Sequence, residues 1–306
     1  MKKLSLILCS RNDNFCGNSL WRLETSVNLN AKRLKNYIKE SEIIISDWGS
    51  EVPLENVLKL NYFAKKIVKF NYIPPEKTKK IPSSFSEVHA LNSAARISSG
   101  RWIGRIDQDT IIGKRFVNWF FKEGYKDESK FFFSLRRDMR KNEKFSVRSI
   151  ERWKLPSKKE RDSIYFWRGA VGILLIPRKE YFYVRGYDET NIFRNHMEHE
   201  LICRLKKRIQ LVDLGKILNY DFYHIYHNKS ANKILPHNPL INPKKLERSK
   251  KIIVNNLNWG KNELSFKQLL IVYTKKNFVK FYNFIKKITP KKIKDFYKKN
   301  YLKNEK

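Results

Sequence analysis

The chain has 306 residues, of which 41% are hydrophobic and 14% aromatic, so it can bury a sizeable core and is not a disordered chain. Lysine and arginine number 65 against 30 acidic residues, and the resulting net charge of +35 favours polyanionic partners such as nucleic acids, anionic membranes and phosphorylated substrates. Because the basic residues are spread along the whole chain, charge alone does not choose among these partners.

Short β-rich runs alternate with helical patterns through the first 110 residues. The predicted strands cover residues 4–9, 42–46, 66–70 and 102–106. Between them, helices are predicted over residues 19–37 and 86–98, and a short helix begins after Pro53. This alternation predicts right-handed crossovers and a mostly parallel central sheet.

The second half of the chain continues with strands and helices before its character changes. A helix is predicted near residues 116–125, a charged helix over 198–208, and strands over 131–135, 170–176 and 210–214. Residues 136–163 are dense in charge, and we expect an excursion or a flexible loop there. From about residue 240 onward the sequence consists of basic, aromatic-rich helical segments.

The three cysteines, Cys9, Cys16 and Cys203, are too few and too scattered for a disulfide framework or a zinc site. They indicate a reducing compartment. The apolar run at residues 4–9 is too short for a signal peptide, and no run approaches the ~20 apolar residues that span a bilayer. We therefore expect a cytoplasmic protein, either soluble or bound at a membrane surface.

Acidic residues follow three of the predicted strands: Asp13, Asp47, and the pair Asp107 and Asp109. Ligands of parallel α/β sheets bind beyond the carboxyl ends of the strands. Two carboxylates one residue apart can supply oxygen ligands to Mg²⁺ or Mn²⁺, and diphosphate oxygens can complete the coordination shell. Alone, the Asp107-Gln108-Asp109 motif is weak evidence, because two aspartates in a surface turn are common.

The residues around this motif resemble a known enzyme family. Residues 86–109 combine a helix containing Asn92, a glycine at position 100 and a strand that ends in Asp107-Gln108-Asp109. This stretch resembles the centre of nucleotide-sugar glycosyltransferases with the A-type fold, especially the large family 2. Further stretches resemble that family in the family's order, and the last of them also resembles galactosyltransferase-like enzymes: residues 6–13, 45–50, 169–172, 184–189 and 197–205.

The resemblance covers about residues 4–230 and implies a single Rossmann-like α/β catalytic domain over residues 1–235. The donor half would span about 1–115 and the acceptor half about 116–235, with a basic helical extension over 236–306. The implied activity is metal-dependent transfer of a sugar from a nucleoside-diphosphate sugar, expected to be UDP-linked. The acceptor would be a hydroxyl group of a glycan or glycolipid, as in polysaccharide biosynthesis, and the transfer would invert the anomeric centre.

On the donor side, the resemblance implies that Asp47 hydrogen-bonds the base or the ribose of the nucleotide. Arg11 and Asp13 would line the same pocket, and Asn92 and Gln108 are also assigned to donor binding. Two alternatives stay open from the residues themselves. Asp47 can be a turn former before a glycine, and Asn92 can be an ordinary surface residue of its helix.

For the metal, the resemblance implies that Asp109 is a direct ligand and that Asp107 contacts the ribose, the metal or a metal-bound water. A histidine often follows near the end of this catalytic domain, and the sequence offers His224 and His227. Neutral imidazole suits Mn²⁺ better than Mg²⁺. We favour His227 without excluding His224.

For the acceptor side, the resemblance places Glu198 where the family carries its general base, which deprotonates the acceptor hydroxyl. Here Met197 stands in place of an acidic residue and Glu198 in place of aspartate, so Glu200 remains an alternative base. Because of these departures, a non-catalytic relative also remains open. Three residues of the downstream motifs are assigned to the acceptor side: Gly169, Arg185 and Gly186.

The C-terminal segments carry apolar stripes at helical spacing with lysines between them, around residues 266–273 and 278–285. Such helices can lie on an anionic membrane surface, which would suit a lipid-linked acceptor. Alternatively, they pack on the catalytic domain and expose their lysines. Both alternatives stay open.

Two other classes of protein compete with this interpretation. The net charge suggests a nucleic-acid-binding protein, but no zinc-finger spacing, RNP-like strand motif or helix-turn-helix is recognisable, and no nucleic-acid partner is expected. A sugar-nucleotide-forming nucleotidyltransferase would carry a glycine-rich phosphate loop after the first strand. Gly17 alone does not supply such a loop.

Overall fold

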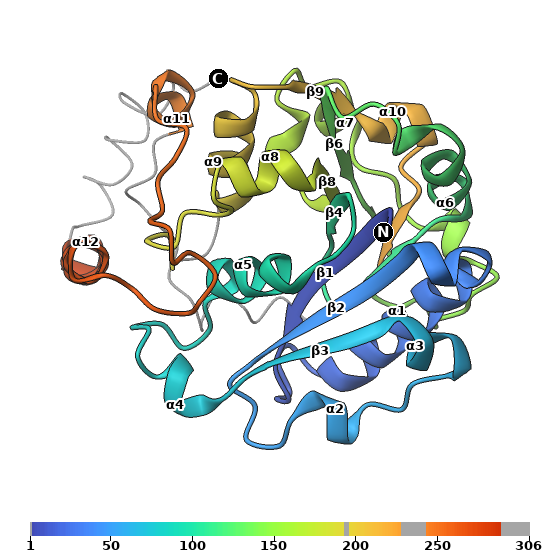
Figure 1. Ribbon diagram of the computed structural model, residues 1–306, viewed down its shortest axis with the longest axis horizontal. Coiled ribbons are helices and arrows are strands. Elements are labelled where there is room, and N and C mark those ends of the chain that lie inside the picture. The colour runs from blue at the N-terminus through green and yellow to red at the C-terminus, as the bar shows by residue number, and fades with distance from the viewer. Residues whose placement is uncertain (1, 193–195, 228–242, 289–306) are drawn as a thin grey trace.

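The computed structural model describes residues 2–192, 196–227 and 243–288, and its centre is a seven-stranded sheet (Figure 1). The strand order is β3-β2-β1-β4-β8-β6-β9. The strands are β1 (Leu4–Ser10), β2 (Ser41–Trp48), β3 (Val68–Ile73), β4 (Trp102–Arg105), β6 (Lys130–Leu135), β8 (Val171–Pro177) and β9 (Gln210–Asp213).

Most neighbouring strands of this sheet are parallel. The pairs β1–β2, β2–β3, β1–β4 and β6–β9 are parallel, whereas β8 is antiparallel to both of its neighbours, β4 and β6. Among the described strands of the sheet, β8 is therefore the one that runs against the others. The predicted α/β class with a mostly parallel sheet is confirmed.

Helices cover both faces of the sheet (Figure 1). Successive side chains of a strand point to opposite faces, so the continuous apolar runs of β1, β2 and β4 supply two cores at once. Leu6 and Ile43 pack toward α1 (Ser19–Arg33), α3 (Tyr62–Ile67) and α6 (Lys114–Trp119). Ile7 and Ile44 pack toward α5 (Glu87–Ile97), α8 (Arg178–Tyr183) and α9 (Met197–Leu205).

The predicted helix over 19–37 is shorter than expected. α1 ends at Arg33, and Lys35–Glu40 forms a separate 3-10 helix in which Tyr37 has non-helical backbone angles. The Tyr37 ring stacks on Phe121 with centroids 3.9 Å apart, so a tertiary contact replaces the last helical turn. The remaining α-helices are α2 (Leu54–Val57), α4 (Pro75–Thr78), α7 (Lys158–Arg161), α10 (Leu214–Leu218), α11 (Pro243–Arg248) and α12 (Phe266–Ile288). Short helices of other types are the π-helix Phe120–Gly124 and the 3-10 helices Ile150–Arg152 and Phe166–Arg168.

A small second sheet lies beside the carboxyl end of β4. It has the order β5-β10-β7, formed by β5 (Thr110–Ile112), β10 (Phe222–His224) and β7 (Arg137–Asp138). β10 is antiparallel to β5 and parallel to β7. This sheet joins the Asp107-Gln108-Asp109 turn to a strand more than a hundred residues later in the chain.

The charge-dense segment 136–163 leaves the main sheet as predicted, but it is anchored. Ile150 and Trp153 are buried and form a small core with Tyr223. The Arg137 guanidinium donates to three backbone carbonyls, including that of Glu151 at 2.6 Å. The segment therefore supports β10 rather than extending freely into solvent.

Residues 249–262 pack on the α/β domain, whereas the predicted division at residue 235 lies outside the described residues. Trp259 is buried in the core beside α5, and the Arg96 side chain donates to the Trp259 carbonyl at 2.7 Å. The Gly260 amide donates to Glu189 at 2.6 Å. These contacts join the start of the predicted extension to both the donor half and the acceptor half.

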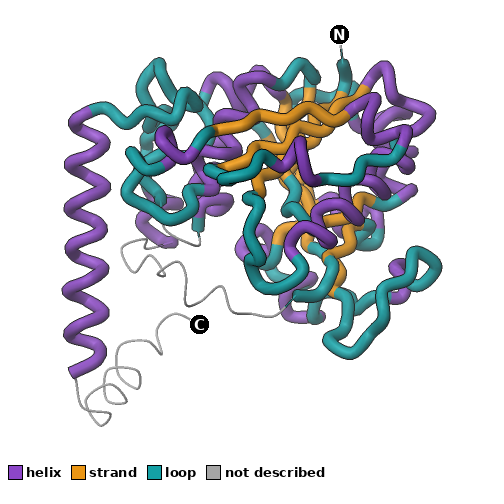
Figure 2. The backbone as a smooth tube through the Cα atoms, turned by 90° about the horizontal axis from the view of Figure 1, so that it is seen from below, coloured by secondary structure: helices purple, strands orange, loops and turns teal. Residues whose placement is uncertain are grey.

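α12 follows this segment and lies at one side of the domain (Figure 2). Its Val272 is fully buried in a cluster with Trp48 and Ile81. Among the described residues, no helix combines the length and the apolarity that a bilayer-crossing segment requires.

Candidate functional site

A polar cavity of about 300 Å³ opens beyond the carboxyl ends of β1 and β4. This is where a parallel α/β sheet binds ligands. Two aromatic side chains, Phe15 and Phe85, line it together with acidic, basic and imidazole groups. The charged and polar side chains in its wall are Ser10, Arg11, Asp13, Ser19, Arg22, Glu87, Asp107, Gln108, Asp109, Arg136, His224 and His227.

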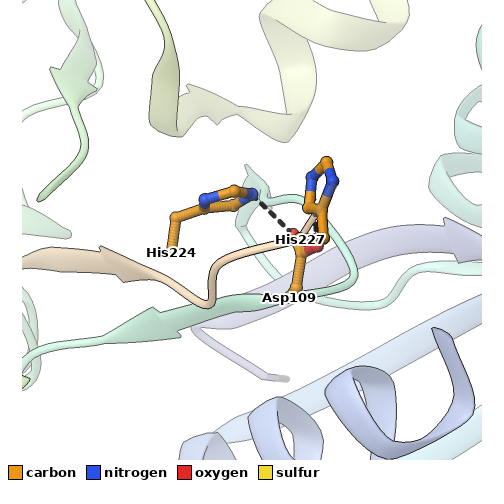
Figure 3. A group of neighbouring side chains, drawn as sticks. All are labelled: Asp109, His224 and His227. Carbon is orange, nitrogen blue, oxygen red and sulfur yellow. Dashed lines mark ion pairs between the residues drawn. The ribbon is translucent and has the colours of Figure 1, made fainter. Parts of the chain in front are cut away.

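Asp109, His224 and His227 gather at one wall of this cavity (Figure 3). One side-chain ligand atom from each residue lies within 4.8 Å of the others. His224 Nε2 is 3.3 Å from Asp109 Oδ1, and His227 Nε2 is 3.8 Å from Asp109 Oδ2. Asp109 is the predicted direct metal ligand. His224 and His227 are the two histidines between which the sequence left the choice open, and both lie in the cluster.

Backbone pairing brings these distant residues together. In the antiparallel pair β5–β10, His224 lies opposite Thr110, the residue after Asp109. The amide of Ile225 donates to the Asp109 carbonyl at 3.1 Å, which continues the ladder past the end of β10. Two members of the cluster, Asp109 and His224, are therefore supported by paired strands, and His227 follows three residues after β10.

Asp138 fixes the orientation of the His224 ring. His224 Nδ1 lies 3.0 Å from Asp138 Oδ1, and β7 pairs with β10 so that these two residues are neighbours in register. Burial would lower the pKa of His224, but the carboxylates of Asp109 and Asp138 outweigh it and the pKa is raised. A carboxylate behind a metal-binding histidine sets its tautomer and its direction.

The donor set fits a divalent transition metal. Ligands about 2.1 Å from one ion lie roughly 3 Å apart when they are at right angles, close to the separations in this cluster. Two imidazoles with one carboxylate suit Mn²⁺ better than Mg²⁺, which prefers oxygen ligands. Burial would raise the pKa of Asp109, but the neighbouring His224 and Arg22 hold it far below its usual range, so the carboxylate is ionised. An ionised carboxylate is the form that binds metal.

Asp107 does not join this cluster, although it was predicted to bind either the metal or the ribose. Its Oδ1 lies 2.8 Å from Arg105 Nη2, and its Oδ2 lies 2.7 Å from Arg136 Nη1. The two aspartates lie in a turn, so their side chains leave the backbone in different directions. Asp107 therefore faces two arginines, and Asp109 faces the histidines.

Four of the residues assigned to donor binding line the cavity: Arg11, Asp13, Asp107 and Gln108. Arg11 Nε donates to Asp13 Oδ2 at 2.7 Å, and the Arg11 guanidinium lies over the Phe85 ring at 5.6 Å. Gln108 accepts a hydrogen bond from the Ser10 hydroxyl. These groups place a cation, an aromatic ring and polar groups at the mouth of the cavity.

Asp47 and Asn92 do not belong to the described residues that line the cavity. Asp47 is buried and accepts hydrogen bonds from the Ser50 hydroxyl and from the Leu54 amide, the latter at 2.7 Å. This geometry matches the turn-forming alternative. The surface alternative for Asn92 is wrong, because its side chain is fully buried and bonds both the amide and the carbonyl of Tyr187.

The predicted acceptor-side residues lie in turns away from the cavity wall. Arg185 and Gly186 have φ of 58° and 64°, and a Cβ on Gly186 would meet the Asn92 side-chain oxygen at 2.2 Å. Arg185 Nη1 donates to the Asn255 carbonyl at 2.9 Å. A Cβ on Gly169 would meet a methyl group of Leu135 at 2.5 Å, so a side chain there would require Leu135 to shift.

Glu198 lies on α9 and reaches the charged residues at the end of β4. Its Oε1 is 3.1 Å from Arg105 Nη2, the same nitrogen that contacts Asp107 and Glu87. Burial raises the pKa of Glu198 against the opposing charge of Arg105, and it raises the pKa of Glu87 to about 7. One buried guanidinium therefore connects a carboxylate of the cavity wall to the predicted base.

Glu200 is engaged elsewhere. Both of its oxygens pair with Arg204, at 2.6 and 2.7 Å, and Arg204 also donates to the carbonyls of Val184 and Gly186. This buried, bidentate ion pair ties α9 to the turn that follows α8. Of the two predicted bases, Glu198 is the one whose charge partners reach the cavity.

The sequence reading missed several charged residues of this site, chiefly Arg22, Arg105, Arg136 and Asp138. Arg22 contacts Asp109 through Nη1 and donates through Nη2 to the Phe15 carbonyl at 2.7 Å. A signal existed for Arg105, because a charged residue inside the apolar strand 102–106 requires buried partners. Arg136 and Asp138 carry no comparable signal, since they lie in a segment dense in charge.

No family model and no curated protein matches the sequence. Solved structures that resemble the chain include the catalytic domain of Drosophila β1,4-galactosyltransferase 7 in complex with xylobiose, with 14% identity, a TM-score of 0.48 and 84% of each chain covered. S. aureus TarS has 15% identity and a TM-score of 0.45, with 73% of this chain and 60% of that chain covered.

A third similar structure is the mannosyltransferase PcManGT from Pyrobaculum calidifontis in complex with GDP-Man and Mn²⁺. Its identity is 11% and its TM-score 0.47, with 74% of this chain and 56% of that chain covered. The chain thus spans less than two thirds of the TarS and mannosyltransferase chains. Similarity at this level does not define which residues of the chain act on a substrate.

Proposed function

We propose that the chain is a metal-dependent glycosyltransferase that moves a sugar from a nucleoside-diphosphate sugar, with UDP as the expected nucleotide, to a hydroxyl group of a glycan or glycolipid. The observation that supports this most is the Asp109, His224 and His227 cluster in the wall of a cavity at the carboxyl ends of β1 and β4. The cavity joins potential metal ligands to guanidinium groups and aromatic rings.

On the donor side, Asp109, His224 and His227 would hold Mn²⁺, which when bound supplies Lewis-acid stabilisation of a departing diphosphate. Arg136 lines the same cavity and can donate to phosphate oxygens from the guanidinium atoms that do not contact Asp107 and Asp138. Arg11 and Phe85 offer a cation and a ring for the nucleoside part. This division assigns phosphate binding to one end of the cavity and base binding to the other.

On the acceptor side, Glu198 would act as the general base. Its carboxylate takes the proton of the acceptor hydroxyl while that oxygen bonds to the anomeric carbon. The bond from this carbon to the diphosphate oxygen breaks at the same time, and the diphosphate leaves with the electron pair. Attack opposite the leaving group inverts the anomeric centre. Burial raises the pKa of Glu198, which makes the group a stronger base than an exposed glutamate.

Two of the alternatives proposed from the sequence, a nucleic-acid-binding protein and a non-catalytic relative, are less well supported. A site for a polyanion would avoid carboxylates, yet the cavity wall carries Asp13, Glu87, Asp107 and Asp109. A non-catalytic relative would have no need to retain the ligand cluster. A cytoplasmic location, peripheral membrane contact and a lipid-linked acceptor remain predictions.

The proposal is tested by following nucleotide release from a panel of UDP- and GDP-linked sugars with Mn²⁺, with and without a chelator. We expect slow release from at least one donor even without acceptor, and loss of release with chelator or with Asp109→Asn. Asp162→Asn, at an exposed aspartate outside the cavity wall, is the matched control. Release that persists with chelator and with Asp109→Asn would overturn the metal site. Salt-dependent DNA binding with no release from any donor would support the nucleic-acid alternative.

A further inference from the structure

α12 is a 23-residue helix attached to the domain along one face. On that face Val272 is fully buried with Trp48 and Ile81, and Gln268 is buried as well. Lys275 Nζ also donates to the Thr190 hydroxyl at 2.8 Å. Figure 2 shows the helix at the side of the domain.

The helix also carries large apolar side chains that are exposed. Phe266, Leu270, Tyr273 and Phe281 are 83%, 59%, 51% and 61% exposed. At about 100° per residue these four positions fall within an arc of roughly 80°, opposite Gln268 and Val272. The apolar stripe therefore points away from the domain rather than into it.

This arrangement bears on the two alternatives for the C-terminal helices that the sequence left open. If α12 served only to pack on the domain, its apolar stripe would be buried and its outer face would be lysine-rich. The packed face instead holds Gln268, Val272 and Lys275, whereas Phe266, Tyr273 and Phe281 are exposed. Four large apolar side chains exposed in a row on one helix face indicate an interaction surface.

The charge of the helix indicates the kind of partner. Residues 266–288 contain six lysines and no acidic residue. Two copies of such a helix would repel each other across an apolar contact. The partner must complement both the exposed apolar stripe and the positive charge of α12. An anionic lipid bilayer does so, because it has an apolar interior beneath negatively charged headgroups.

We infer that α12 docks the protein on an anionic membrane surface, with Phe266, Leu270, Tyr273 and Phe281 inserted among the lipids. The lysines that flank this stripe, such as Lys267 and Lys280, then lie at the level of the headgroups. The docked helix lies in the plane of the interface. This inference does not depend on the proposed activity, since it rests on α12 alone.

The experiment measures sedimentation of the full chain with vesicles of phosphatidylcholine and with vesicles that also contain phosphatidylglycerol. We expect binding to the anionic vesicles, weakened by salt, and little binding to the zwitterionic ones. Phe266→Ser combined with Leu270→Ser should weaken the binding roughly tenfold or more. Both positions are exposed, so thermal unfolding and nucleotide release should be unchanged.

Ile164→Ser is the matched control, because Ile164 is 76% exposed and does not belong to α12. It should leave vesicle binding unchanged. Lys267→Gln combined with Lys280→Gln should weaken binding at low salt only. Equal binding to both vesicle types, or binding that the serine variants do not weaken, would overturn the inference. So would a dimer in the absence of lipid that these variants dissociate, because α12 would then pair with a second copy.

Discussion

Arg105, at the end of β4, lies 3.1 Å from Glu198 on α9 and contacts Asp107 at 2.8 Å through the same nitrogen. The guanidinium is buried, and a third carboxylate, Glu87, also faces it. The donor-side turn and the proposed base are thus held by one cation. Such a group keeps two parts of a reaction centre in fixed positions.

Replacing Arg105 by methionine should destabilise the fold by about 3 kcal/mol at neutral pH, because three carboxylates lose their common cation. The cost should shrink as the pH falls toward 5. Without the guanidinium the pKa values of Glu87 and Glu198 rise further, and protonation then relieves the repulsion. Urea unfolding at pH 5 and pH 7.5 measures both effects. Arg105→Lys, which keeps the charge, should cost less, and a cost that does not depend on pH would contradict this interpretation.

Glu198→Gln should impair activity but not stability, whereas Glu200→Gln should impair stability but not activity. Glu198→Gln should lower the rate of transfer to an acceptor by roughly 10²- to 10⁴-fold while leaving donor binding and the free energy of unfolding almost unchanged. Glu200→Gln should destabilise the fold by about 3 kcal/mol, because it leaves Arg204 buried without its bidentate partner.

The transfer rate and the free energy of unfolding in urea should be measured for both variants. The folded Glu200→Gln protein should retain transfer activity. A fully active Glu198→Gln protein would show that the base lies elsewhere.

Asp138→Asn should weaken Mn²⁺ binding roughly 10- to 100-fold without abolishing it, because Asp138 orients the His224 ring without touching the metal. His224→Ala should abolish measurable binding. Titration calorimetry with Mn²⁺ in the presence of UDP measures both, and Asp162→Asn serves as the control. An Asp138→Asn affinity equal to that of the unchanged protein would remove Asp138 from the site.

Glu189→Gln should flatten the pH dependence of stability. Burial raises the pKa of Glu189 from 4.5 to about 7, although Gly260 and Asn92 donate hydrogen bonds to it. The folded state therefore binds the proton more tightly than the unfolded state, so the free energy of unfolding falls as the pH rises from about 4.5 to 7. The loss amounts to at most about 3 kcal/mol.

Glutamine is neutral at every pH and still accepts both hydrogen bonds through its side-chain oxygen. Urea unfolding between pH 4.5 and 8 should give a smaller slope for Glu189→Gln than for the unchanged protein. A slope that is unaltered by the substitution would assign the dependence to other groups.

The sequence predicted the sheet well because the apolar runs at residues 4–9, 42–46 and 170–176 are unambiguous and their order implies crossovers. It could not predict that β8 runs antiparallel to its neighbours, since a strand buried on both faces reads the same in either direction. It could not predict that residues 249–262 pack on the domain either, because Trp259 and Gly260 reach the core through contacts that no local pattern records.

For the site, the order of the motifs pointed to Asp109, His224 and His227, which form a cluster in the structure. The motifs could not predict which groups each aspartate of the turn contacts. Asp107 and Asp109 look equivalent in a turn, and the structure directs one to arginines and the other to histidines. Asp47 and Asn92 were assigned to the donor because their positions match a motif, whereas their hydrogen bonds stabilise turns. The role of these polar residues depends on whether their side chains are buried, and a sequence motif does not record burial.

The most direct test of the proposed metal and nucleotide site is thermal unfolding with UDP and Mn²⁺, added singly and together, for the unchanged protein and His224→Ala. A ligand that binds only the folded state raises stability, and a hundredfold excess over its Kd should raise the Tm by roughly 5 °C or more. We expect that rise only when nucleotide and metal are both present, and its loss in His224→Ala. No rise with Mn²⁺ and any nucleoside diphosphate would contradict the proposed function.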